Sequence, residues 1–456
     1  MKRSNLIALL VGVAGVLPSS TALAATIVVD TTADTFTPGA CRAGIPGMCS
    51  LRTAVYRASQ SHDWDTIVLS ADTYVIDNVV EGPIDIKDAI FISGAGVGQT
   101  TIQVDLPGEF GMHATGSDTW VMFGGVSVEG VAADAGAIHA DGAQYVYFSQ
   151  SEVHSFDYDT EVVYADDADL LIQGTTFTGN TTDSASGSVV RGVGDVGGAS
   201  FAWIYDATFT ANEANGSGAV LSVDYDDSTM DGVEVSDCQG DVIVDMQGPY
   251  DIDDMHFHDN NSSQYGVRVS DNMTGTVSSS TFSHNQLLQG TIRVESDGHM
   301  MVHNSTFALN AAQQGSVVNN SGWFGASHVT AVDNASHLGA FYRNGGTMDF
   351  VLNAIDGHPG NPACGGPTPN LTFGYNVFAD DSCDTAPNDL TNTDLQVGPL
   401  ADNGGPTPTM MPLPGSPMID AFGGVWVSPV DQRGESRNPG DDMDVGAVEC
   451  QPGECI

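Results

Sequence analysis

The middle of the chain repeats one pattern of hydrophobic and polar positions. A phenylalanine is followed three positions later by an asparagine in five segments, and between these segments a glycine precedes β-branched or apolar residues. The phenylalanines are Phe177, Phe209, Phe257, Phe282 and Phe307, with weaker copies of the pattern at Val235 and Val329. The last three phenylalanines are evenly spaced along the chain. A period of roughly 25 residues, built of short alternating strands and polar turns, is typical of a parallel β-solenoid.

The period also predicts where the side chains lie. Because side chains alternate across a strand, the five phenylalanines should point inward and stack between coils about 4.8 Å apart. The asparagines should lie at bends, adopt left-handed backbone angles and hydrogen-bond to their equivalents in the next coil. These asparagines are Asn180, Asn212, Asn260, Asn285 and Asn310. The predicted fold is all-β, a right-handed parallel β-helix, and scattered strands of a β-sandwich are the alternative.

The two ends of the repeat region set the predicted domain division. Leu51, Val55 and Ala58 form one apolar helical stripe, so a short helix over Leu51–Ser59 is expected to cap the open end of the solenoid. The β-helix is expected from about residue 65 to 356. The predicted units are a cap with the first coils (25–76), the main β-helix (77–356) and an irregular C-terminal region (357–456).

The segment 1–24 has the composition of a secretory signal peptide. Lys2 and Arg3 precede an apolar stretch over 6–17, and Ala22-Leu23-Ala24 is a small-residue cleavage site. We therefore expect export, with cleavage after Ala24 and no transmembrane segment in the mature chain. The mature chain is expected to be secreted or to lie at the cell exterior, and outer-membrane association is left open.

Charge narrows the classes of partner. The chain of 456 residues has 12 Lys plus Arg against 58 Asp plus Glu, a net charge of -46. Such a balance argues against nucleic acid and anionic membranes as partners. It suits a monomeric protein exposed to salt or divalent cations.

Seven cysteines lie after the predicted signal peptide, and export permits disulfides. Local pairing is the simplest scheme, although sequence alone does not fix connectivity. It joins Cys41 to Cys49, Cys364 to Cys383 and Cys450 to Cys455, and leaves Cys238 as a buried thiol.

Both ends of the chain resemble known families. The segment around Cys49-Ser50-Leu51-Arg52, followed by Asp65-Thr66-Ile67-Val68-Leu69, resembles the CSLREA-type N-terminal region of secreted bacterial β-helix proteins. The segments from Gly398-Pro399-Leu400 to Asp431-Gln432-Arg433-Gly434 resemble the choice-of-anchor Q domain. The repeats are also similar to those of polymorphic outer-membrane proteins. These resemblances imply a β-helix protein of the cell surface.

Two arginines are candidates for ligand binding. Arg268 and Arg293 are separated by the same interval as the neighbouring repeat phenylalanines, so they should stack on one outward stripe, one coil apart. They are a candidate clamp for an acidic sugar. The alternative is charge compensation by nearby acids, namely Asp271, Glu295 and Asp297.

Acidic clusters at turns are candidates for calcium binding, since stacked coils bring such clusters together. The candidate ligands are Asp224, Asp226, Asp227, Asp251, Asp253 and Asp254. A solvated acidic face is the alternative. His256 and His258 should both point outward beside Phe257, but the sequence identifies no third zinc ligand, so an exposed pair is favoured.

The solenoid fold hosts both binding proteins and enzymes. Pectate-lyase-like and polygalacturonase-like enzymes need basic residues or paired carboxylates in recognisable settings, and the sequence does not contain them. No catalytic residue is predicted. The favoured interpretation is a non-catalytic protein that binds glycan, matrix or a surface protein in adhesion or display. The alternative is a polysaccharide lyase or glycoside hydrolase acting on an extracellular polysaccharide.

Overall fold

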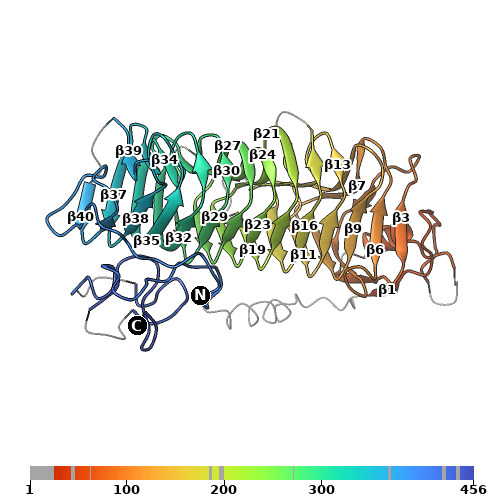
Figure 1. Cartoon of the computed structure of the whole chain (residues 1–456). Helices are drawn as coiled ribbons and strands as arrows, with labels where there is room; N and C mark the ends of the chain where they lie inside the picture. The colour runs from red at the N-terminus through yellow and green to blue at the C-terminus, as the bar shows by residue number, and fades with distance from the viewer. Residues whose placement is uncertain are drawn as a thin grey trace.

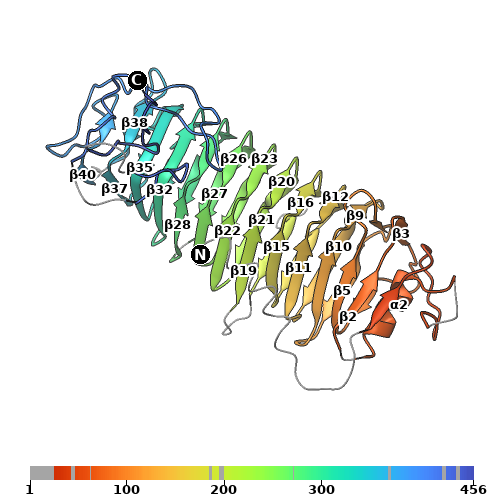
Figure 2. The ribbon, with the colours of Figure 1, turned by 90° about the horizontal axis from the view of Figure 1, so that it is seen from below.

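The computed structural model describes residues 25–42, 47–61, 63–183, 187–194, 200–270, 272–367, 371–423, 428–437 and 442–455. The predicted signal peptide lies outside the described residues. The chain winds into a long rod of stacked strands, and its C-terminal segment folds back against the side of the rod (Figures 1 and 2). Within the described part of the chain, no helix is both long enough and apolar enough to cross a membrane.

Every strand ladder of the rod is parallel. Each coil contributes strands to three faces, and we call these the first, second and third face. The first face contains β2 (Asp65–Val68), β5 (Ala89–Ser93), β8 (Trp120–Gly124), β11 (Tyr145–Ser149), β15 (Asp169–Gln173), β19 (Phe201–Tyr205), β22 (Asp227–Asp231), β25 (Tyr250–Asp253), β28 (Thr274–Ser278), β37 (Thr347–Val351) and β40 (Leu371–Gly374), and β1 (Thr26–Val28) pairs with β2. The second face contains β3 (Thr73–Ile76), β6 (Thr101–Val104), β9 (Ser127–Gly130), β12 (Glu152–His154), β16 (Thr176–Thr178), β20 (Thr208–Thr210), β23 (Glu234–Ser236), β26 (His256–His258), β29 (Thr281–Ser283), β38 (Ala354–Gly357) and β41 (Val377–Phe378).

Two long strands run across both of these faces, and a separate sheet forms the third. The long strands are β32 (His299–Ala308) and β35 (Trp323–Asn334). The third face contains β4 (Ile84–Ile86), β7 (Glu109–Thr115), β10 (Ala135–Asp141), β13 (Asp157–Tyr158), β14 (Val163–Asp166), β17 (Thr181–Thr182), β18 (Val190–Val193), β21 (Glu213–Asp224), β24 (Gln239–Met246), β27 (Asn261–Val269), β30 (Gln286–Leu287), β31 (Gly290–Val294), β33 (Ala311–Ala312), β34 (Val318–Asn320), β36 (Phe341–Arg343) and β39 (Cys364–Gly365). Strands of the parallel rod therefore begin before residue 77 and continue beyond residue 356, outside the segment predicted as the main β-helix.

The repeated phenylalanines form an inward column on the second face, as predicted. Phe177 pairs with Phe209 and Phe282 with Phe307 in register, and all four are fully buried. Their ring centroids are 4.9 Å and 4.8 Å apart and the rings are nearly parallel. The repeat period therefore sets a continuous apolar axis through the solenoid.

The asparagines of the repeat form the predicted ladder. The side-chain amide of Asn260 donates to Oδ1 of Asn285 at 3.1 Å, and that of Asn285 donates to Oδ1 of Asn310 at 2.8 Å. The backbone prediction was wrong, because the left-handed residue is the one before the asparagine, for example His284 (φ 56°) or Leu309 (φ 62°). The asparagine itself turns inward and satisfies the buried backbone groups at the bend.

Cys238 occupies a ladder position in the coil where Val235 replaces phenylalanine. Its thiol donates to the carbonyl oxygens of Ser236 and Phe209 at 3.2 and 3.5 Å, and it accepts from the Asn212 amide at 4.0 Å. Burial raises the pKa of this thiol to about 11. The thiol is thus a weak substitute for an asparagine side chain.

Replacing Cys238 by asparagine is expected to stabilise the protein by about 1 kcal/mol, since stronger amide hydrogen bonds would continue the ladder. Urea denaturation of C238N against wild type measures the difference. C238S is the matched control, because serine is too short to reproduce the ladder. A C238N protein less stable than C238S would contradict this account.

The predicted cap and disulfides are confirmed. The helix α2 (Leu51–Ala58) begins at Ser50, whose hydroxyl accepts a hydrogen bond from the Thr53 backbone N–H, and Val55 and Ala58 are fully buried. Disulfides join Cys41 to Cys49, Cys364 to Cys383 and Cys450 to Cys455. Cys238 is free and buried.

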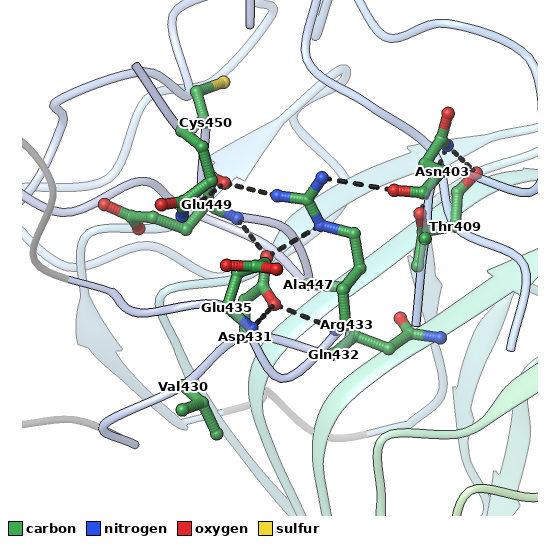
Figure 3. A network of polar contacts seen from close by, with 12 residues as sticks. Asn403, Thr409, Val430, Asp431, Gln432, Arg433, Glu435, Ala447, Glu449 and Cys450 are labelled. Carbon is green, nitrogen blue, oxygen red and sulfur yellow. Dashed lines mark hydrogen bonds and ion pairs between the residues drawn. The ribbon is translucent and has the colours of Figure 1, made fainter. Parts of the chain in front are cut away.

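The C-terminal lobe, residues 379–455, packs against the second face where β29 and β32 lie. Gln432 inserts between lobe and rod: its amide donates to Thr281 Oγ1 at 2.8 Å and accepts from Thr306 Oγ1 at 2.6 Å. The neighbouring Arg433 holds the lobe together, donating to Asp431 Oδ2 at 3.0 Å and the Glu449 carbonyl at 2.7 Å (Figure 3). The polar segment Asp431-Gln432-Arg433 therefore folds the lobe and docks it.

Candidate functional site

The two predicted arginines lie one coil apart on the outward side of the third face. Arg268 pairs in register with Arg293, and each already has an acidic partner. Arg268 binds Asp245 through two hydrogen bonds, one of 2.8 Å from Nε, and Arg293 binds Glu295 at 2.6 Å. The predicted stacking one coil apart is confirmed, and both guanidinium groups have the acidic partners that charge compensation requires, while ligand binding by this pair stays a prediction. Glu295 was one of the expected compensating acids, whereas Asp245 was not.

The six aspartates predicted to bind calcium are distributed over two faces and their turns. Asp224 is the last residue of β21 on the third face. Asp226 lies in the turn that follows, and its carboxylate accepts a hydrogen bond from the Ser200 hydroxyl. Asp227, Asp251 and Asp253 lie on the first face, and Asp254 follows in a left-handed turn. Asp251 and Asp253 accept hydrogen bonds from Thr276 and Ser278 on the next coil. Calcium binding stays a prediction.

An aromatic row lies on the outward side of the first face, in the N-terminal half of the rod. It consists of Trp64, Trp120, Tyr145, Phe201 and Trp203. Successive ring centroids are 4.9, 4.0, 5.9 and 4.3 Å apart. Trp64 is 42% exposed and the others are half-buried. Inward neighbours such as Val121 and Ala202 already fill the core, so these rings cover the outside of the sheet.

The first face changes character at β22. Asp227 follows Phe201 in register, and Asp231 is followed by Asp253 on the next coil. We call Asp227, Asp231, Asp251 and Asp253 the acidic row. The face therefore joins a mainly aromatic half, in which Asp169 lies between Tyr145 and Phe201, to an acidic half, and neither is part of the repeat pattern.

The second face holds a cluster of metal-ligand type. Glu234, His256 and His258 present ligand atoms within 4.8 Å of one another, and no other such set of three or more occurs in the residues that the structure describes. Burial and the charge of His258 lower the pKa of His256 to about 4, so its imidazole is neutral at pH 7. The sequence predicted the outward histidine pair but missed Glu234. The sequence could have revealed it, because Val235 is a copy of the repeat phenylalanine. Its in-register pairing with Phe257 places Glu234 beside His256.

A cavity of about 580 Å³ lies between the C-terminal lobe and the rod, and Asp356 and Asp394 are part of its lining. Burial, together with the charges of Asp333, Asp380 and Asp394, raises the pKa of the Asp356 carboxyl to about 6. The native state therefore holds this proton more tightly than the unfolded chain does. Stability contributed by the proton is present below the ordinary value of 3.8 and is lost as pH rises toward 6.

Asp356→Asn is expected to stabilise the protein by about 1 kcal/mol at pH 8, because the amide removes a half-buried charge from an acidic surrounding. No electrostatic gain is expected near pH 3.5, where the aspartate is already protonated. Urea denaturation at both pH values measures the difference, with the exposed Asp381→Asn as control. An equal effect at both pH values would contradict the raised pKa.

A comparison with protein-family models agrees with this architecture. The family model described as a right-handed beta helix region matches residues 135–307 and 191–355. No curated protein matches.

Similar solved structures include two mannuronan C-5 epimerase A-modules of Azotobacter vinelandii. The AlgE6 module is 12% identical, with 71% of this chain and 94% of that chain covered and a TM-score of 0.34. The AlgE4 module is 12% identical, with 70% and 94% covered and a TM-score of 0.35. The Dettilon tailspike protein is 12% identical, with 76% and 65% covered and a TM-score of 0.28. The match over these residues and the continuous parallel ladders show that the chain has the right-handed parallel β-helix fold.

Proposed function

We propose that the protein is an exported, non-catalytic rod that binds a neutral polysaccharide along the aromatic row, in adhesion or display at the cell surface. The aromatic row is the observation that carries this proposal. Outward aromatic rings on a solenoid face serve no need of the core, and contiguous exposed apolar surface marks interaction sites. Trp and Tyr rings suit such sites because an apolar ring face is combined with a polar tip.

The row is built to accept a ligand without rearrangement. The indole N–H of Trp120 donates to Gln144 Oε1 at 2.7 Å, and its ring lies against both Trp64 and Tyr145. Because these side chains already contact one another, binding would order few additional rotamers, and this lowers the entropic cost of association. The row extends along the rod from Trp64, next to β2, to β19, although the coils of β5 and β15 contribute no ring, so it fits an extended chain better than a small molecule.

Charge favours a neutral chain. Removal of Lys2 and Arg3 with the signal peptide leaves 12 − 2 = 10 basic residues against 58 acids, or 10 − 58 = −48. The acidic row continues the same face directly after Phe201. A negatively charged binding surface repels a ligand that is also negatively charged. An anionic polysaccharide is therefore disfavoured on this face.

Export is supported by the three disulfides, which are typical of extracellular proteins. The resemblance of the two chain ends to the CSLREA region and the choice-of-anchor Q domain supports a place at the cell surface. A monomer suffices, because one rod carries the whole aromatic row.

Affinity electrophoresis of the mature chain in gels that contain neutral or anionic polysaccharides tests the proposal. Retardation by at least one neutral polymer is expected, with about 10-fold weaker binding in W120A and W203A. W323A is the matched control, because Trp323 lies on the same side of the rod in the later strand β35. Binding that all three variants retain, or retardation by anionic polymers only, would contradict the proposal. Release of reducing or unsaturated ends would favour the enzymatic alternative.

A further inference from the structure

We propose that Glu234, His256 and His258 form a binding site for one divalent transition-metal ion, zinc foremost. The site lies on the second face, away from the aromatic row, and does not depend on the proposed polysaccharide binding. Two imidazoles and one carboxylate are a donor set that zinc accepts, with a fourth position left for water or another ligand.

The β-helix register places these three side chains together. His256 and His258 flank Phe257 on β26, so both point outward while Phe257 is fully buried between them. Glu234 pairs in register with His256 on the preceding coil. All three positions are therefore fixed by a parallel ladder rather than by a loop, and a site on rigid strands holds its geometry.

The distances suit a metal ion. Nε2 of His258 is 3.2 Å from Oε1 of Glu234, and the two histidine ring centroids are 4.0 Å apart. Ligand atoms at 2.0–2.1 Å from a tetrahedral zinc ion are about 3.4 Å apart from one another. The three ligand atoms, all within 4.8 Å, reach that spacing with small side-chain rotations.

His258 has a carboxylate at each ring nitrogen. Nδ1 is 2.8 Å from Oδ2 of Asp259, and Nε2 faces Glu234. A neutral imidazole has one N–H and cannot donate to both carboxylates. If Nδ1–H donates to Asp259, the lone pair of Nε2 points at the Glu234 oxygen, and a metal ion between these two atoms would be bound by both. A carboxylate that orients the second nitrogen of a histidine ligand is the usual surrounding of a zinc site.

The surroundings partly shield the site. On the next coil His256 faces Thr281, which the C-terminal lobe covers through its hydrogen bonds to Gln432 and Pro408. The coil of His256 and His258 is therefore next to the coil that the C-terminal lobe covers. Glu234 is exposed, so an ion has a path from solvent.

The test titrates zinc chloride into the mature chain, prepared without a polyhistidine tag and freed of metal with a chelator. Calorimetry is expected to find one equivalent of zinc and a melting temperature that rises with zinc. His256→Gln and His258→Gln should each bind at least 10-fold more weakly. His154→Gln is the matched control, because His154 lies in the column of His258 several coils earlier, and it should bind as wild type does.

Folding of each variant is checked by its melting curve in chelator. Asp259→Asn provides a second, milder variant at an exposed turn, with a 10-fold weaker affinity expected from loss of the orienting carboxylate. Absence of stoichiometric zinc binding would overturn the proposal. Zinc binding that persists unchanged in His256→Gln, His258→Gln and Asp259→Asn would also overturn it.

Discussion

Replacing Phe282 by alanine is expected to lower the free energy of unfolding by about 3–5 kcal/mol. The side chain is fully buried, and its ring lies 4.8 Å from that of Phe307 and 5.7 Å from that of Phe257. Truncation would therefore remove contacts to the coils on both sides. Each coil of a solenoid packs closely against the coil on either side. These neighbours can move only slightly into the cavity that the alanine side chain leaves.

Urea denaturation of F282A against wild type measures this loss. F373A is the matched control, since Phe373 is 67% exposed and its truncation should change stability by less than about 0.5 kcal/mol. Equal midpoints for F282A and wild type would contradict the idea that the phenylalanine column stabilises the rod.

Much of the rod follows from the sequence because the repeat is local and regular. The phenylalanine of each copy lands inward and the asparagine lands at the bend, so the pairings of Phe257 with Phe282 and of Asn260 with Asn285 need only the even spacing of the repeat. The three disulfides follow from short separations along the chain. The cap helix follows from one apolar stripe that ends at Ala58.

The candidate sites depend on register, and the register of this chain varies. The coil that brings Glu234 to His256 is shorter than the next one, which brings His256 to Thr281. The aromatic row combines coils of still other lengths, for instance those that bring Tyr145 toward Phe201. A shift of one residue would turn each of these side chains inward. The residue types alone therefore do not predict which side chains meet in each candidate site.

The C-terminal lobe was predicted only as an irregular region, because short bridges and turns leave no hydrophobic period. It packs on the rod through a buried apolar cluster that includes Val332 and Met418, and through polar contacts between distant residues, such as Asn304 of the rod and Arg437 of the lobe at 2.9 Å. Arg437 is almost completely buried, and it also donates to the Gly446 carbonyl at 2.9 Å and lies 3.6 Å from a Glu449 carboxyl oxygen. One guanidinium thus joins three separate segments.

Replacing Arg437 by methionine is expected to cost about 3 kcal/mol at pH 8, because it leaves Glu449 as an uncompensated buried charge and removes the hydrogen bonds to Asn304 and Gly446. Thermal unfolding and proteolytic release of the lobe both measure this loss. R57M is the matched control, since Arg57 is exposed on α2 and its loss should leave both measurements unchanged.

The cost of this substitution should fall as pH is lowered, and the sign follows from Glu449. Burial raises the pKa of this carboxyl from 4.5 to about 7 even though Arg437 lowers it. The native state therefore gains stability from the bound proton as pH falls through 7, and the gain is complete below 4.5. Removing Arg437 raises this pKa further, so the variant takes up its proton at higher pH than wild type does. At pH 5 the carboxyl is neutral in the variant, and only the lost hydrogen bonds remain to destabilise it. A cost that is equal at pH 5 and pH 8 would show that the ion pair with Glu449 does not hold the lobe in place.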